Sequence, residues 1–259
     1  MNHKYKIAFL IAVALMVTPC VVYSQDDFGG GGRGAVGLED VGLRFGAKVG
    51  FGSADLSLAK FSKLGSSRTT FSVGGFAEYR LNTWLSAAAG VEYTQNGGAN
   101  LPTRLFFSNV DPYVFTGVPG TGIGTRAINS NLRVHTLEIP ITARLSMPEM
   151  NGMKPFFLIG PSIGVNIAAK TTDYLMDDYG FGATYGNMVY EYSQNVGGRI
   201  SPADFSVLIG TGSEFSAYGY IFELGVTYRM GLLNQNDFKY ALYQEYTSNS
   251  LMATIAIKF

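Results

Sequence analysis

The chain has 259 residues, enough for one large domain, and its composition is that of a β protein. It contains 33 Gly, 16 Tyr and 18 Phe, while only 15% of its residues are charged, a balance that favours strands and turns over helices. The 19 basic and 19 acidic residues give a formal net charge of zero. Because a nucleic-acid-binding surface needs an excess of basic charge, we expect no nucleic acid partner.

The N-terminus has the features of a secretory signal. A basic start leads into an apolar run at 7–17, and Val22 and Ser24 stand at the small-residue positions of a cleavage site. The apolar run is about half of the ~20 residues that a spanning helix needs, so we expect cleavage after Ser24, with an uncleaved anchor as the alternative. Residues 1–24 are then a signal peptide. Because Cys20 is the only cysteine, the mature chain can form no disulfide.

Residues 25–39 are rich in glycine and predict a flexible N-terminal segment. From there to the end, 40–259, apolar and polar residues alternate with the period of two that is typical of half-buried strands. The alternation predicts eight strands, at 41–51, 71–80, 85–94, 137–145, 156–169, 205–214, 220–230 and 251–259.

The connections between these segments alternate between short and long. A soluble eight-stranded barrel or sandwich would also show alternating strands, but the polar face here is mostly Gly, Ala, Ser and Thr, which suits the crowded inside of a narrow barrel. We therefore predict an all-β fold, an eight-stranded antiparallel transmembrane β-barrel with short periplasmic turns and long extracellular loops. The short turns are expected at 81–84, 147–154 and 216–219, and the long loops at 52–69, 96–131, 171–203 and 232–248.

The predicted inner face carries nearly balanced charge, six bases against five acids. Side chains fill a lumen of this size and unpaired buried charge is costly, so we expect a mutually paired network that plugs the barrel. Pro140 and Pro161 fall inside two predicted strands, where a missing N–H weakens pairing. The predicted lumenal charge network consists of Arg44, Lys48, Glu78, Arg80, Glu92, Glu138, Arg144, Glu214, Glu223, Arg229 and Lys258.

Four stretches carry a resemblance to a known family. "HTLEIPITARL" at 135–145, "FFLIGPSIGV" at 156–165, "GTGSEF" at 210–215 and "ELGVTYRMGLLN" at 223–234 resemble the PorT-like outer-membrane β-barrel proteins of Bacteroidota. The resemblance implies an outer-membrane location. It also suggests a link to a secretion assembly, since the member that names the family is associated with type IX secretion and gliding, while most relatives have no assigned role.

The last strand looks like the signal that the barrel-assembly machinery reads, with Ile255, Ile257 and Phe259 at alternate positions. The predicted partners are therefore this machinery, outer-membrane lipid and lipopolysaccharide, and other envelope or secretion proteins.

The functional expectation is a non-enzymatic scaffold or recognition barrel, without catalytic residues, metal or cofactor. His135 is the one histidine of the mature chain and its position in the alternation puts it on the lipid-facing side. The alternatives are an outer-membrane lipid- or peptide-hydrolysing enzyme and a narrow passive channel. Tyrosine offers rigid amphipathic area for recognition, and the loop at 171–203 contains Tyr174, Tyr179, Tyr185, Tyr190 and Tyr192.

Overall fold

The computed structural model describes residues 42–58, 62–101, 123–179, 189–237 and 245–259. The predicted signal peptide and the glycine-rich segment at 25–39 lie outside these residues. The described part belongs to one compact unit, Asp40–Phe259. No helix within it is long and apolar enough to cross a membrane.

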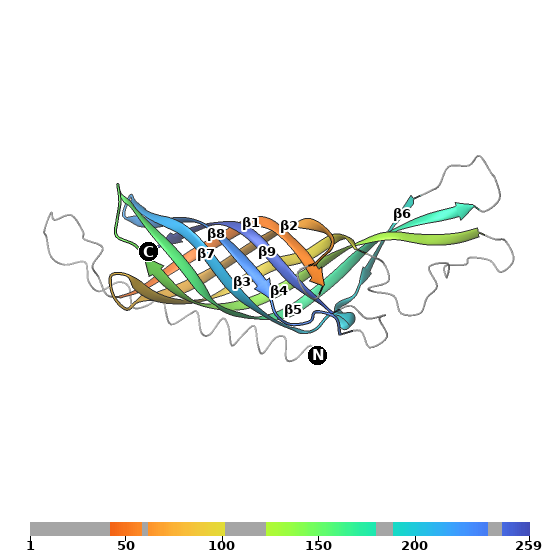
Figure 1. The fold of residues 1–259 in the computed structure, drawn as a ribbon, viewed down its shortest axis with the longest axis horizontal. Coiled ribbons are helices and arrows are strands. Elements are labelled where there is room, and N and C mark those ends of the chain that lie inside the picture. Colours follow the sequence, from red (N-terminus) through yellow and green to blue (C-terminus); the bar gives the residue numbers. More distant parts are fainter. Residues whose placement is uncertain (1–41, 59–61, 102–122, 180–188, 238–244) are drawn as a thin grey trace, which may run out of the picture. The chain divides into compact units, whose positions relative to one another are not determined.

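The described residues form nine strands and one short 3-10 helix (Figure 1). The strands are β1 (Leu43–Leu58), β2 (Ser62–Arg80), β3 (Leu85–Leu101), β4 (Ile123–Ser146), β5 (Met153–Tyr179), β6 (Val189–Asn195), β7 (Ala203–Ala217), β8 (Tyr220–Gly231) and β9 (Tyr246–Lys258), and the helix η3 spans Gly197–Arg199.

Eight of these strands close on themselves. They pair in the order β4-β3-β2-β1-β9-β8-β7-β5, and β5 also pairs with β4, so the ring has no open edge. Every neighbouring pair is antiparallel, and the last strand lies between β1 and β8. The predicted eight-stranded antiparallel barrel is confirmed. Closure leaves no unpaired strand edge in the ring, which suits a lipid environment without water to satisfy backbone groups.

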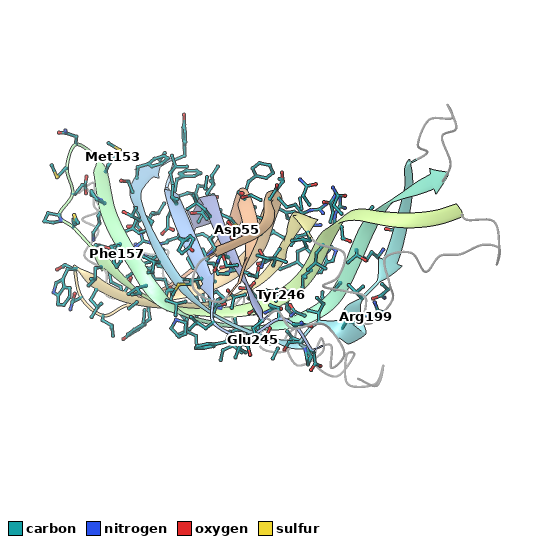
Figure 2. The ribbon with its side chains drawn as sticks, turned by 45° about the vertical axis from the view of Figure 1, so that its right-hand side comes forward. Asp55, Met153, Phe157, Arg199, Glu245 and Tyr246 are labelled. Atoms are coloured by element: carbon teal, nitrogen blue, oxygen red, sulfur yellow. The ribbon has the colours of Figure 1, made fainter. Side chains whose placement is uncertain are left out.

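The alternation of the sequence becomes an outward apolar face and an inward face of small and polar residues. Side chains project outward from the wall of the barrel (Figure 2). Burial alternates in step, as in β7 and β8. Such a belt of exposed apolar side chains would be an aggregation hazard in water but suits lipid. Exposed members include Val49, Phe51, Val73, Ile141, Ile159, Ile163, Leu224, Val226, Leu251 and Ile255.

The strands are longer than predicted, so the expected long loop at 52–69 is wrong for most of its length. β1 runs on to Leu58 and β2 begins at Ser62, and the two strands pair up to these residues across a register shift between Ala54 and Leu56. The outward residues of this stretch, such as Ser53, are polar, so the sequence shows no alternation of apolar and polar residues here. The two backbones nevertheless continue to pair beyond the belt of exposed apolar side chains.

The expected loop at 171–203 is also partly wrong. β5 continues to Tyr179, and from Lys170 onward its neighbour changes from β7 to β6. Over the same stretch β4 pairs with β5 from Ile123, well before β3 joins it near Ser130. β4, β5 and β6 thus form a three-stranded arm that extends beyond the other strands (at the right of Figure 1).

Both prolines lie inside strands, as the sequence predicts, and the local pairing is interrupted beside them. Pro140 pairs with Ser162, but the next assigned pair of β4 and β5 is Ala143 with Ile159, in the same register. At Gly160 in this gap, a Cβ atom would lie 2.0 Å from the carbonyl oxygen of Ile141. Glycine therefore allows the close approach of the two strands where proline removes a donor.

A charged residue introduced on the outward face of β8 tests whether this face contacts lipid. Leu224→Arg should lower the free energy of unfolding by about 2–4 kcal/mol, because an arginine in the middle of the lipid-facing belt must be desolvated. The measurement is guanidinium unfolding of the barrel folded into lipid vesicles. Leu233→Arg is the matched control, since Leu233 is exposed but lies after the end of β8, and it should cost about 1 kcal/mol or less. Equal costs for both variants would contradict the orientation.

Candidate functional site: the filled lumen

Glycines on the inner face create the space in which two aromatic rings lie. Gly46 pairs with Phe76, and a Cβ atom at Gly46 would lie 2.6 Å from the Phe76 ring. Gly212 pairs with Phe156 in the same way, at 2.7 Å. Any larger residue at either glycine would displace the ring from its place inside the barrel.

A group of buried charges at the end of the barrel that carries the short turns is named here the basal network. Its members come from five strands: Glu78 (β2), Arg144 (β4), Glu214 (β7), Glu223 (β8) and Lys258 (β9). Each side chain is at most 12% exposed. The Lys258 ammonium group pairs with all three carboxylates, at 2.5 Å from Glu214 Oε1. An ammonium group has three protons to donate, so each carboxylate can receive one.

Arg144 is the second cation of the basal network. Its Nη2 lies 2.8 Å from Glu214 Oε1, its Nη1 contacts Glu223, and Glu78 lies 3.8 Å away. The guanidinium carbon lies 3.6 Å from the centre of the Phe156 ring, which adds a cation–π contact away from water. The three carboxylates approach within 4.8 Å of one another, close enough to hold a metal ion. In this structure the arginine and lysine supply the positive charge.

A second set of buried charges, the central network, lies further along the barrel. Arg229 Nη1 is 2.5 Å from Glu138 Oε1 and donates a hydrogen bond to Thr94 Oγ1 at 3.2 Å. Its Nη2 is 3.8 Å from Glu92, which also pairs with Lys48. Arg229 and Glu138 are almost completely buried, so each needs the other to remain charged there.

Neutral polar groups continue the filling beyond the central network. Asn166 Nδ2 donates to Gln235 Oε1 at 2.9 Å and to the Ser201 carbonyl at 2.7 Å. Gln235 Nε2 in turn donates to Asp204 Oδ1 at 2.7 Å, and Thr136 Oγ1 donates to Asn166 Oδ1 at 2.7 Å. These bonds tie the segment after β8 to the wall formed by β4, β5 and β7.

Apolar side chains fill the end of the lumen that faces the long connections. The segment between β6 and β7 folds back here: Val196 N donates to the Ala169 carbonyl at 3.0 Å, and Ser201 N donates to the Gln235 carbonyl at 2.9 Å. We name the resulting cluster the apolar layer. It consists of Leu56, Leu101, Leu132, Val134, Ala169, Val196, Ile200 and Tyr246.

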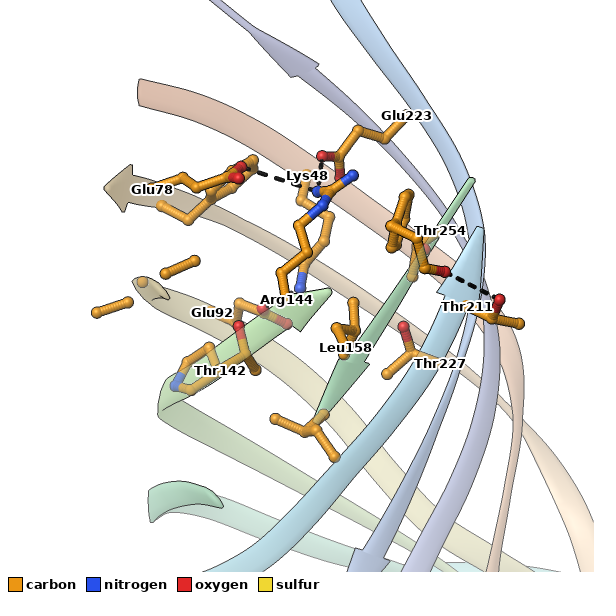
Figure 3. A pocket seen from close by; sticks show the side chains of 17 residues that line it. Lys48, Glu78, Glu92, Thr142, Arg144, Leu158, Thr211, Glu223, Thr227 and Thr254 are labelled. Carbon is orange, nitrogen blue, oxygen red and sulfur yellow. Dashed lines mark hydrogen bonds and ion pairs between the residues drawn. The ribbon is translucent and has the colours of Figure 1, made fainter. Parts of the chain in front are cut away.

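A cavity of about 60 Å³ lies in the lumen, bordered by members of both charged networks (Figure 3). Lys48 and Glu92 line it together with Arg144 and Glu223, and the rest of its wall includes threonines, small residues, two phenylalanines and two leucines. A buried water needs about 10–15 Å³ by this measure. The cavity therefore has the size of a few water molecules and is too small for a nutrient-sized solute.

The structure brings most of the predicted lumenal charges together. Lys48, Glu78, Glu92, Glu138, Arg144, Glu214, Glu223, Arg229 and Lys258 all form ion pairs. Arg44 and Arg80 lie at the short-turn end, on β1 and β2.

The other predicted site residues lie apart from the lumenal charges. Ile255 and Phe259 are exposed on the outward face of the last strand, and Ile257 is partly exposed there. His135 is partly exposed on the outward side of β4, where its Nδ1 is hydrogen-bonded to the Tyr93 hydroxyl.

The tyrosines predicted to lie in a recognition loop belong mainly to strands. Tyr174 and Tyr179 are in β5, and Tyr190 and Tyr192 are in β6, all on the three-stranded arm. Tyr185 lies outside the described residues. The loop was expected because polar and aromatic residues here follow no apolar alternation, yet the backbones pair.

Three inward residues were missed by the sequence analysis. Lys154 lies in the predicted short turn at 147–154, Asp204 lies just before the predicted strand at 205–214, and Phe156 is the first residue of the predicted strand at 156–169. All three are buried. Lys154 and Phe156 share the inward parity of β5, so extending the alternation towards the strand end could have found them.

Comparison with known proteins supports the architecture. The family model described as "Outer membrane protein beta-barrel domain" matches residues 25–236. Among curated protein sequences, none matches the chain.

Several solved structures are similar at low identity. Neisserial surface protein A is 14% identical, with 84% of this chain and 99% of that chain covered, at a TM-score of 0.42. Ail of Yersinia pestis, in complex with the heparin analogue sucrose octasulfate, is 11% identical. The match covers 84% of this chain and 99% of that chain, with a TM-score of 0.37. The outer membrane protease OmpT from Escherichia coli is 10% identical. The match covers 83% of this chain and 96% of that chain, with a TM-score of 0.25. Similarity of this degree says nothing about the activity of the chain.

Removal of one cation tests the basal network. Arg144→Met should lower the free energy of unfolding by about 3–5 kcal/mol, because the three buried carboxylates would lose one of the two cations of the basal network. Guanidinium unfolding in lipid vesicles measures the change.

Two further variants separate charge pairing from packing. The double variant Arg144→Met/Glu223→Gln should recover part of the loss, since it removes an uncompensated carboxylate. Arg133→Met is the matched control on the same strand, because Arg133 is exposed on the outward side, and it should change the free energy by about 0.5 kcal/mol or less. A loss at Arg144 no larger than at Arg133 would contradict the account.

Proposed function

Because the chain belongs to the family of outer membrane protein beta-barrel domains, we propose that it is a non-enzymatic scaffold or surface-recognition component of a Gram-negative outer membrane. The observation that carries this proposal is the filled lumen. The basal network, the central network and the apolar layer occupy successive levels of the barrel, so the interior serves stability and leaves recognition to the two ends.

The filling argues against a passive channel. A conducting pore needs a continuous water path, and an ion inside it needs polar groups that bind weakly enough to release it. Here the charged groups form ion pairs with one another at short distances. Leu101, Leu132 and Tyr246 of the apolar layer are at most 1% exposed. A solute would have to break several ion pairs and displace this layer.

The surroundings of His135 argue against a hydrolytic enzyme. A general base has to reach a nucleophile or water near its substrate. His135 lies on the outward face of the barrel, and its Nδ1 is engaged by the Tyr93 hydroxyl. The buried glutamates of both networks are paired with arginine and lysine, which supports a structural role for them.

The three-stranded arm is our candidate for the recognition surface. With the short turns on the periplasmic side, as in bacterial outer-membrane barrels, the arm stands on the extracellular side. Tyr190 of β6 is opposite Leu175 of β5, and Tyr192 is opposite Asp173. Tyrosine is well suited to recognition because it presents a large amphipathic surface at low entropy cost.

The resemblance of 135–145 and the other matched stretches to PorT-like proteins of Bacteroidota supports a more specific form of the proposal. In this form the barrel is an accessory part of an envelope or secretion assembly. It is exported by a cleaved signal peptide, and the barrel-assembly machinery inserts it by reading Ile255, Ile257 and Phe259. Lipid and lipopolysaccharide then surround its outward face.

Affinity purification of the tagged barrel from its native outer membrane in mild detergent, with quantitative mass spectrometry, tests the assembly role. We expect a reproducible, stoichiometric set of envelope proteins. Tyr190→Ser/Tyr192→Ser should deplete members of this set at least fivefold. Tyr218→Ser/Tyr220→Ser is the matched control at the opposite end of the barrel, and it should leave the set unchanged.

A barrel recovered alone would contradict the assembly role. Equal depletion by both double variants would contradict recognition through the arm. A check that each variant still migrates as a folded barrel in unheated gel samples separates lost recognition from lost folding.

A further inference from the structure

Three basic side chains gather at the short-turn end of the barrel, and we name them the basic mouth. Arg44 is the second residue of β1, Arg80 is the last residue of β2 and Lys154 is the second residue of β5. They therefore reach the same end of the lumen from three strands. Arg80 and Lys154 are buried, and Arg44 is partly exposed.

The basic mouth concentrates positive charge. Arg44 and Arg144 act electrostatically on Arg80, and all three act on Lys154. Together with Lys258, five cations among the described residues share this end with three carboxylates of the basal network. Those carboxylates already contact Arg144 and Lys258. Glu214 also attracts Arg80 and Lys154, and Glu78 attracts Arg80, but within this group the cations still outnumber the carboxylates.

The side chains of Arg44 and Lys154 can each donate a further hydrogen bond. The Nη1 nitrogen of Arg44 is buried and has no hydrogen-bond partner in the described structure. Lys154 Nζ donates to the backbone carbonyl of Thr83 at 3.0 Å, a neutral acceptor in the turn between β2 and β3. A buried guanidinium nitrogen without an acceptor is unfavourable, so an incoming acceptor with negative charge would be stabilised here.

We propose that the basic mouth is a binding site for an oxyanion of the carboxylate or phosphate class, presented from the short-turn side of the barrel. The guanidinium fork of Arg44 matches the paired oxygens of either group. The Lys154 ammonium group supplies a point charge beside it. The site does not depend on the proposed scaffold role, since it uses neither the arm nor its tyrosines.

Trp84 lies close enough to the basic mouth to serve as a fluorescent reporter of ligand binding. Trp84 is the single tryptophan, it is exposed, and it follows Thr83, whose carbonyl accepts the Lys154 hydrogen bond. A ligand that draws Lys154 towards itself should change the environment of this turn. Trp84 fluorescence of the folded full-length barrel in detergent micelles therefore reports binding.

The experiment titrates this barrel with inorganic phosphate and, separately, with succinate, while sodium chloride holds the ionic strength constant. We expect a saturable change in fluorescence for at least one of the two anions. Arg44→Gln should weaken the apparent affinity at least tenfold. Arg133→Gln removes the same charge from the outward face of β4, and it should change the affinity less than twofold.

The outcomes separate the sources of the anion. Saturation with phosphate alone supports a phosphate ligand, saturation with succinate alone supports a carboxylate, and saturation with both supports a general oxyanion site. If Arg44→Gln fails to fold, Lys154→Gln serves as the second variant, with the same expected loss. A change that does not saturate, or equal affinities in the Arg44→Gln and Arg133→Gln variants, would overturn the proposal.

Discussion

Charge that is enclosed in a narrow barrel has to be neutralised inside it, and this constraint organises the structure. Transfer of an ion from water to a low-dielectric interior costs several kcal/mol, which only close partners can offset. Lys258 on β9 meets Glu78 on β2, although β1 lies between these strands, and Arg144 on β4 meets Glu223 on β8. These pairs join strands that share no backbone hydrogen bonds. They therefore hold the ring in one shape.

The same constraint connects the backbone to the proposed function. Glycine at 46 and 212 leaves space for Phe76 and Phe156, and the Phe156 ring lies against the Arg144 guanidinium. A ring packed against a cation keeps water away from it, which strengthens the ion pairs nearby. An interior built in this way is occupied mainly by side chains that pair with one another. We infer that contacts with other molecules are made at the ends, through the arm on one side and the basic mouth on the other.

The sequence was sufficient for the barrel and for the identity of most inward charges, because lipid on one side and a crowded lumen on the other impose a strict period of two. It was insufficient where this contrast fades. Ser53 faces outward beyond the apolar belt, and the arm residues around Tyr190 follow no apolar alternation, so paired strands looked like loops. Which charges pair could not be predicted either. The partners of Arg144 come from β2, β7 and β8, and their proximity depends on the register and closure of the ring.

The conductance of the wild-type barrel in a planar lipid bilayer tests the central claim most directly. An open porin reconstituted by the same procedure shows that insertion would be detected. We predict no unitary current steps at either polarity, because the ionic networks and the apolar layer fill successive levels of the lumen in the described part of the chain. Reproducible unitary steps from the wild-type barrel would contradict the filled lumen on which this account depends.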